Sequence, residues 1–169
     1  QPSGDESYLI TVTADDGNGG TVTTAFTWRV LNIPPSALDD SVTTPEDTPV
    51  IASILTNDND PDNDPLTITE INGQPITLGG PAVPTANGSV QLLTDAFGQQ
   101  VLLFTPNPDF NGVETLVYKV NDPNSGFDTA TLTINVLPQN DAPTADALAD
   151  LSSLDSDAVN VPLGPFFHD

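Results

Sequence analysis

Apolar and polar residues alternate along much of the chain in short runs with the period of two that a β-strand requires. The runs are rich in Thr, Val and Ile, and clusters of Gly, Pro, Asn and Asp separate them. Thr fills most polar positions, which is typical of an antiparallel sheet with one solvated face. Helical periodicity is nearly missing, so the pattern predicts an all-β chain. The sets expected to face inward are Tyr8, Ile10, Val12 and Ala14; Leu116, Tyr118 and Val120; and Ala130, Leu132, Ile134 and Val136.

One run differs from the others because it is apolar on both faces. Residues 99–106, QQVLLFTP, predict a central strand that other parts of the molecule cover on each side. Residues 89–95 predict the neighbouring strand. The Asn-Gly pair at 87–88 and the Phe-Gly pair at 97–98 predict turns at the two ends of that strand.

The chain also repeats part of itself. A shift of 106 residues lays 10–30 on 116–136 without a gap, and inward positions match inward positions throughout. More weakly, 143–169 matches 35–60, since both begin with Pro, continue with an apolar strand and end in acidic residues.

The repeat predicts three pieces. Residues 1–33 form the C-terminal part of one repeat, 34–138 a complete repeat and 139–169 the N-terminal part of a further one. Pro-rich segments at 32–36 and 137–143 join the pieces, as stiff linkers do. A complete unit of about 105 residues with about seven short strands has the size of an immunoglobulin-like sandwich.

Composition limits the partners that the chain can have. It has 2 Lys and Arg against 24 Asp and Glu, so its formal net charge is 2 − 24 = −22. Nucleic acid is not expected as a partner, because binding a polyanion requires Lys and Arg to displace its counterions, and anionic membranes are disfavoured for the same reason. No apolar run is long enough to span a bilayer. The 37% of apolar residues provides for a buried core, and the absence of Cys excludes disulfides, thiol catalysis and thiolate metal sites.

Four aspartates stand at alternate positions in TNDNDPDNDP, residues 56–65. Such an array costs free energy through self-repulsion, and a divalent cation reverses the sign of that contribution. Calcium takes six to eight oxygen ligands in flexible geometry, which favours it over other ions. An EF-hand is excluded because the sixth position is Asn63 and the twelfth is Thr69. The alternative is that these acids are solvated turn residues. The predicted calcium ligands are Asp60, Asp62 and Asp64, together with Asp58.

Several segments resemble the cadherin-like and tandem immunoglobulin-like repeats of large bacterial surface adhesins, including those of the RTX type that type I secretion exports. The segments that carry the resemblance are PEDTPV at 45–50, TNDNDPDNDPLTIT at 56–69, FTPNPDFNG at 104–112 and YKVNDPNSGFDTATLTINV at 118–136. Residues 10–30 look like the last two strands of the same kind of unit.

The resemblance implies Greek-key β-sandwich repeats in tandem, located outside the cell at the bacterial surface, which act as spacers stiffened by calcium. It also implies two further metal ligands, Glu46 and Asp122, because it places their loops at the ends of the sandwich. The leading functional hypothesis is therefore a structural segment of an adhesin or fibre. The alternative is a module whose loops bind a glycan or a protein receptor.

Catalysis has little support from the sequence. His168 is the only histidine and has no nucleophile near it along the chain. The acids stand among Asn and Pro rather than among aromatic residues that could hold a sugar. Trp28 occupies an inward position, which favours a place in a core over a binding platform.

The two-stranded piece at 1–33 is expected to need a cover, because an isolated hairpin is marginally stable in water. One hypothesis is that residues 139–169 of one chain complete this piece in the next chain by strand addition, which would give a head-to-tail filament. The rival hypothesis is that the chain is an excerpt of a longer array whose ends pack on neighbouring repeats.

Overall fold

A computed structural model describes residues 6–140, 144–145 and 167–168. The chain divides into two compact units, Gln1–Leu137 and Pro138–Asp169. In the second unit, β12 (Thr144–Ala145) pairs antiparallel with β13 (Phe167–His168). The predicted partial repeat at 139–169 otherwise lies almost entirely outside the described residues, and its boundaries stay a prediction.

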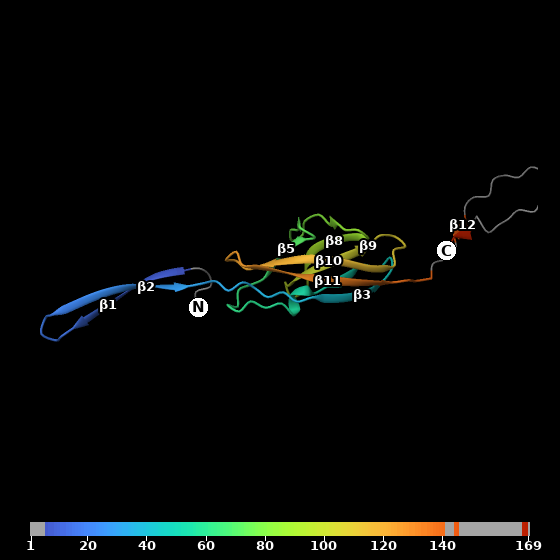
Figure 1. The fold of residues 1–169 in the computed structure, drawn as a ribbon. Coiled ribbons are helices and arrows are strands. Elements are labelled where there is room, and N and C mark those ends of the chain that lie inside the picture. Colours follow the sequence, from blue (N-terminus) through green and yellow to red (C-terminus); the bar gives the residue numbers. More distant parts are fainter. Residues whose placement is uncertain (1–5, 141–143, 146–166, 169) are drawn as a thin grey trace, which may run out of the picture. The chain divides into compact units, whose positions relative to one another are not determined.

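The first unit contains a sandwich of two sheets (Figure 1). One sheet has the strand order β3-β11-β10-β5-β6. The strand β3 lies parallel to β11, and the other neighbours are antiparallel. Its strands are β3 (Asp40–Pro45), β5 (Thr67–Ile71), β6 (Gln74–Pro75), β10 (Gly112–Asn121) and β11 (Phe127–Leu137).

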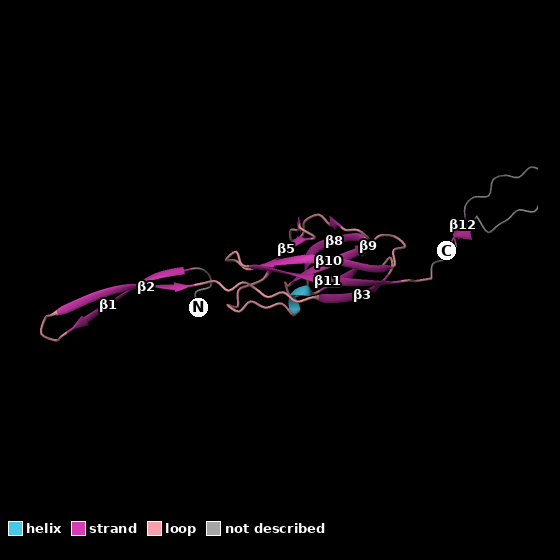
Figure 2. Cartoon of the chain, viewed as in Figure 1, coloured by secondary structure: helices cyan, strands magenta, loops and turns pink. Residues whose placement is uncertain are grey.

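The second sheet is antiparallel and has the order β4-β9-β8-β7. Its strands are β4 (Val50–Ala52), β7 (Val83–Pro84), β8 (Gly88–Thr94) and β9 (Gln100–Pro106). The all-β prediction is confirmed, since the one helical element in the described part of the chain is the short 3₁₀ turn η1, Ile54–Thr56 (Figure 2). The central-strand prediction is also confirmed, because β9 lies between β4 and β8 and buries the adjacent residues Val101 and Leu102.

The core lies between the two sheets and follows the alternation of the sequence. On β10, Leu116, Tyr118 and Val120 are fully buried, whereas the residues between them are at least partly exposed. The second sheet contributes Val90, Leu92, Leu102 and Phe104 to the same cluster. Burial of apolar area on facing sheets is the main source of stability in such a sandwich.

The remaining strands of the first unit, β1 (Glu6–Asp15) and β2 (Thr21–Val30), pair antiparallel as a sheet of their own. The prediction of two strands here is confirmed. The burial expected for Trp28 is wrong within the described part of the chain, since this side chain is 60% exposed. Its inward register is real, but the described residues provide no second layer to cover it.

Candidate metal centre

Three segments meet at one end of the sandwich. They are the linker 32–36 between β2 and β3, the acidic loop 57–66 between η1 and β5, and the turn 122–126 between β10 and β11. The linker is tied to the acidic loop by a pair of backbone hydrogen bonds between Ser36 and Asn59, at 2.8 and 3.0 Å. Segments far apart in the sequence therefore form one surface, which we call the acidic end.

The linker also contacts two of the predicted ligands directly. The Asn32 Nδ2 atom donates to Asp122 Oδ2 at 2.8 Å, and the Ile33 backbone N–H donates to Asp62 Oδ2 at 2.8 Å. The structure thus brings Asp62 and Asp122 to the same linker, although 60 residues separate them in the sequence.

Asp64 joins the same group through the turn. Its Oδ2 atom accepts a hydrogen bond from Asn124 Nδ2 at 2.7 Å. Asp122 organises that turn, because its Oδ1 atom accepts the backbone N–H groups of Asn124 at 2.7 Å and Gly126 at 2.8 Å. A Cβ atom at position 126 would overlap the Asp122 carboxylate and lie 2.9 Å from Pro34 Cα, so only glycine allows the linker to approach this closely.

Asp60 is the acid whose surroundings point most directly to an ion. It is only 5% exposed, and its Oδ1 atom accepts the backbone N–H groups of Asp62 at 2.8 Å and Asp64 at 3.2 Å. Its Oδ2 atom is buried and has no hydrogen-bond partner. A buried carboxylate oxygen without a partner costs free energy that a bound cation would offset. The carboxylate and amide oxygens around it are the donor types that calcium prefers.

Asp58 makes different contacts from the other acids of the loop. Its Oδ1 atom accepts the Leu38 backbone N–H at 2.9 Å and lies 3.2 Å from the Tyr118 hydroxyl. That hydroxyl also lies 2.8 Å from the Leu38 carbonyl oxygen and 2.9 Å from Asp40 Oδ2. Asp58 still borders an open hollow of about 300 Å³ that Asp60 and Asp64 also line.

Glu46 does not share the acidic end. Its backbone N–H donates to the carbonyl of Leu137, the last residue of β11, whereas the turn at Asp122 precedes the first residue of that strand. The Glu46 Oε2 atom accepts a hydrogen bond from Asn111 Nδ2 at 3.1 Å. Glu46 therefore cannot bind an ion together with the other predicted ligands, and a separate ion at its own end stays a prediction.

Three residues of the structure were not among those predicted from the sequence, namely Asn32, Asn124 and Glu114. Glu114 is 3% exposed and accepts a hydrogen bond from Asn87 at 2.6 Å. Its signal was present in the sequence, since it is a charged residue at an inward position two residues before Leu116. The role of Asn124 could have been inferred from the Asp-x-Asn-x-Gly pattern that positions 122–126 share with 16–20.

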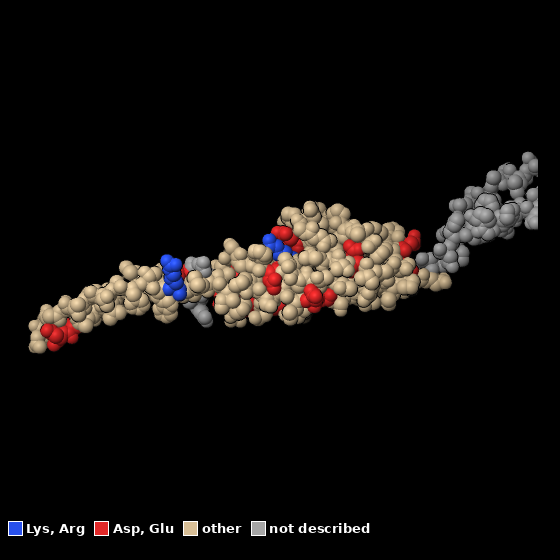
Figure 3. All heavy atoms as spheres, viewed as in Figure 1, with Lys and Arg blue, Asp and Glu red and all other residues tan. Residues whose placement is uncertain are grey.

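Acidic side chains are spread over several places on the visible face of the molecule (Figure 3). Among the described residues, no three acidic or histidine side chains form a ready-made metal cluster. Calcium binding by Asp58, Asp60, Asp62, Asp64 and Asp122 accordingly stays a prediction. The described residues also include no helix with the length and apolar character needed to cross a bilayer.

A family model described as the bacterial Ig domain matches residues 32–135. The chain belongs to this family. The predicted immunoglobulin-like fold is confirmed by this match, whereas export of the RTX type stays a prediction. No curated protein sequence matches the bacterial Ig chain.

Several solved structures are similar to this bacterial Ig chain. An endo-fucoidan hydrolase of glycoside hydrolase family 107 has 14% identity and a TM-score of 0.44 over 82% of this chain and 19% of its own. Mouse clustered PcdhgC3 EC1-3 has 13% identity and a TM-score of 0.42 over 85% of this chain and 46% of its own. PcdhgB3 EC1-4 has 12% identity and a TM-score of 0.40 over 86% and 35%. The chain spans less than half of the length of each.

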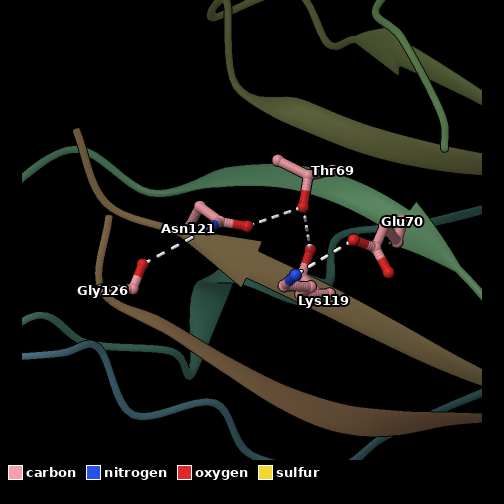
Figure 4. Close-up of polar contacts among 5 residues, drawn as sticks. All are labelled: Thr69, Glu70, Lys119, Asn121 and Gly126. Atoms are coloured by element: carbon pink, nitrogen blue, oxygen red, sulfur yellow. Dashed lines mark hydrogen bonds and ion pairs between the residues drawn. The ribbon is translucent and has the colours of Figure 1, made fainter. Parts of the chain in front are cut away.

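The side of the Ig domain next to the turn 122–126 carries one of the two cations of the chain. Lys119 Nζ lies 3.0 Å from Glu70 Oε1 (Figure 4). The same Nζ atom lies 4.5 Å from the centre of the Phe127 ring. Asn121 accepts a hydrogen bond from the Thr69 hydroxyl at 2.7 Å and donates to the Gly126 carbonyl at 3.4 Å. These contacts tie the turn to β5. They engage the ammonium of Lys119 with Glu70 and leave the acids of the acidic end without a lysine partner.

The contacts of Asp58 give this Ig domain a distinct pH dependence. Burial raises the pKa of Asp58, and the charges of Asp40 and Asp128 add to the rise, although hydrogen bonds from Leu38 and Tyr118 oppose it. Burial likewise raises the pKa of Asp40. Burial and the two carboxylates raise the pKa of Tyr118, so its hydroxyl keeps its proton. One hydroxyl proton cannot serve three acceptors, and a proton on either carboxyl would supply the missing donor.

We expect Asp58→Asn to remove part of this pH dependence. A raised folded-state pKa contributes stability that is fully present below the unfolded value of about 3.9 and is lost as the pH rises through the folded value. The variant should therefore gain stability relative to the unaltered chain as the pH is raised from about 4 towards neutrality, as urea unfolding in chelator would measure. Asp95→Asn serves as a control in an exposed turn. A stability difference that stays constant across this range would contradict the expectation.

Proposed function

We propose that this bacterial Ig domain is a calcium-stiffened structural segment of an extracellular adhesin or fibre. The observation that carries the proposal is the buried Oδ2 atom of Asp60, which has no hydrogen-bond partner in the middle of the acidic end. The family match supports a structural or adhesive role for the chain.

The charge balance of the chain supports an external cation. Its only cations are Arg29 and Lys119, and Lys119 pairs with Glu70. The charge of Asp60, Asp62 and Asp64 therefore has to be offset by an ion from solution if the loop is to be compact. Six to eight oxygens would come from these carboxylates, from Asp122, and from neighbouring amide, carbonyl or water oxygens.

The mechanical consequence follows from the linker contacts. Ile33 donates to Asp62 and Asn32 donates to Asp122, so the same acids that would hold the ion also hold the linker. An ion at this point would restrain three segments at once, because it binds the folded arrangement and not the open one. The linker would then transmit bending and tension to the sandwich instead of moving freely.

Calcium titration of two matched variants tests the proposal. In Asp60 and Asp95 alike, the Oδ1 atom accepts the backbone N–H groups two and four residues later. Substitution by Asn keeps that acceptor, removes the charge and puts an amide NH2 group in place of the second oxygen. We expect dissociation constants on the order of 10⁻⁴ to 10⁻³ M for the unaltered chain, as in other extracellular modules. Asp60→Asn should weaken binding by about tenfold or more, since about 1.4 kcal/mol corresponds to tenfold.

Asp95→Asn should leave the calcium affinity unchanged in the same calorimetric titration. Equal affinities for the two variants, or no saturable heat for the unaltered chain, would contradict the calcium site. Magnesium provides a second comparison, because it dehydrates reluctantly and demands stricter octahedral geometry.

A second candidate function is recognition of a glycan or receptor by the loops. The hollow beside the acidic end favours it, because Asn59, Asn63 and Gln99 offer amide groups that could bind sugar hydroxyls. Saturable binding on a glycan array that disappears in Gln99→Ala would favour this function.

Association with neighbouring repeats or with copies of the chain belongs to the structural proposal, and the uncovered face of β1 and β2 supports it.

A further inference from the structure

The hairpin formed by β1 and β2 has the same register as the hairpin formed by β10 and β11. Ten residue pairs run from Glu6↔Val30 to Asp15↔Thr21 in the first hairpin. Ten pairs run from Gly112↔Val136 to Asn121↔Phe127 in the second. Each pair of the first hairpin maps onto a pair of the second by the same shift of 106 residues.

The turns of the two hairpins are also built by the same hydrogen bonds. The Asp16 backbone N–H donates to the Gly20 carbonyl at 3.0 Å, and Asp122 donates to Gly126 at 3.0 Å. The Asp16 Oδ1 atom accepts the N–H groups of Asn18 at 2.8 Å and Gly20 at 2.9 Å. Asp122 accepts the equivalent groups at 2.7 and 2.8 Å. The two hairpins are therefore the same structural piece, present twice.

Only the second hairpin is covered within the described part of the chain. Leu132 and Ile134 are almost fully buried, whereas their counterparts Phe26 and Trp28 are 53% and 60% exposed. Three elements cover the second hairpin. The strand β5 pairs with the edge of β10 that faces away from β11, β3 pairs with the edge of β11 that faces away from β10, and the second sheet, with Phe104, packs on the apolar face. The first hairpin forms a sheet of two strands only.

The turn of the first hairpin lacks its cover in the same way. At position 126, an added Cβ atom would meet Asn32 and Pro34 of the linker as well as the Asp122 carboxylate. At position 20, the three nearest atoms all belong to the Asp16 carboxylate, and the third of them lies at 3.3 Å. No described residue therefore approaches position 20 as closely as the linker approaches position 126, where Pro34 Cα lies at 2.9 Å.

We propose that the apolar face and edges of the β1–β2 hairpin are the docking surface for the remaining strands of a second Ig unit. The occupant is a segment equivalent to residues 34–111, because these residues cover the equivalent hairpin in the sandwich. It would place an antiparallel strand beside β1, a parallel strand beside β2 and an apolar sheet over Phe26 and Trp28. An isolated two-stranded hairpin is marginal in water, so the complete sandwich is the stable form of this piece.

The proposal does not depend on calcium, because it rests on register, turn geometry and exposure. A chain that binds no calcium could still dock an Ig segment on this hairpin. Conversely, the linker contacts of Asp62 and Asp122 are present in a structure whose hairpin is uncovered among the described residues.

A chain with an internal duplication tests the proposal. A copy of residues 34–111 is placed directly before residue 6. Residue 6 is equivalent to residue 112, so the copy precedes the first hairpin as residues 34–111 precede the second. Trp28 is the only tryptophan of the chain and lies on the proposed surface, so its fluorescence reports on the cover. We expect a shift of its emission to shorter wavelength and a severalfold fall in quenching by acrylamide, a neutral quencher that the net charge of −22 does not repel.

Two variants of the duplicated chain test whether the shielding of Trp28 depends on the apolar face of β2. Phe26→Asp puts a charge on the proposed surface and should return Trp28 to the exposed state. Thr27→Asp, on the other face of the same strand, should leave Trp28 shielded. An exposed Trp28 in the duplicated chain, or equal behaviour of the two variants, would overturn the proposal. Shielding of Trp28 in the unaltered chain with rising concentration would also overturn it, since the occupant would then be a second copy.

Discussion

Chelation of calcium is expected to lower the melting temperature of the Ig sandwich substantially. An ion present at about a hundred times its dissociation constant adds roughly 2.7 kcal/mol to the free energy of unfolding. For a domain of about 100 residues, 1 kcal/mol corresponds to about 4–8 °C, so the expected decrease is about 10–20 °C. Calorimetric scans of the chain in calcium and after dialysis against EDTA would measure it.

The variant Asp60→Asn provides the control for this effect. It keeps the turn bonds to Asp62 and Asp64 through Oδ1, but an uncharged amide nitrogen replaces the buried Oδ2 atom. Its melting temperature should respond to calcium much less than that of the unaltered chain. Identical melting curves of the unaltered chain in calcium and in EDTA would remove the basis of the proposed stiffening.

Replacement of Phe104 by alanine is expected to be the most destabilising single change considered. Phe104 is 0% exposed and pairs with Val50 and Val90 in the centre of the four-stranded sheet. Its ring also lies over Gly88, where a Cβ atom would come within 2.8 Å of it. Truncation of a buried phenylalanine costs about 3–5 kcal/mol, because it loses transfer free energy and leaves a cavity. Urea unfolding in saturating calcium would give this difference.

Phe97→Ala is the matched control, since it removes the same side chain from a turn where the ring is 88% exposed. Its effect should be within about 0.5 kcal/mol of zero. Similar losses for the two variants would mean that the core does not lie between the sheets as described.

The strands could be predicted from the sequence because their alternation is a local property. Leu116, Tyr118 and Val120 are buried as their period of two indicates, and Val101 and Leu102 identify the central strand. Local turn chemistry also predicted the Gly98 turn, which adopts a positive φ of 80°. Each of these features depends on a few consecutive residues.

The composition of the candidate site could be predicted only in part, because it depends on which loops share an end. The separation of Glu46 from Asp122 follows from the parallel pairing of β3 with β11, which no local pattern encodes. Asp58 differs from Asp60, Asp62 and Asp64 for another reason. Its carboxylate contacts Leu38 and Tyr118, which lie 20 and 60 residues away in the sequence, so the alternation within the loop does not indicate these contacts.

The parallel pairing of β3 and β11 determines how the sandwich would respond to tension. The chain reaches β3 from the acidic end and leaves β11 at Leu137, at the opposite end. Six consecutive residue pairs, from Asp40↔Leu132 to Pro45↔Leu137, join the first strand of the sandwich to its last. A pull on the two ends would therefore slide these strands past one another in shear. Their hydrogen bonds would be strained together rather than opened one at a time, so rupture would require a cooperative event.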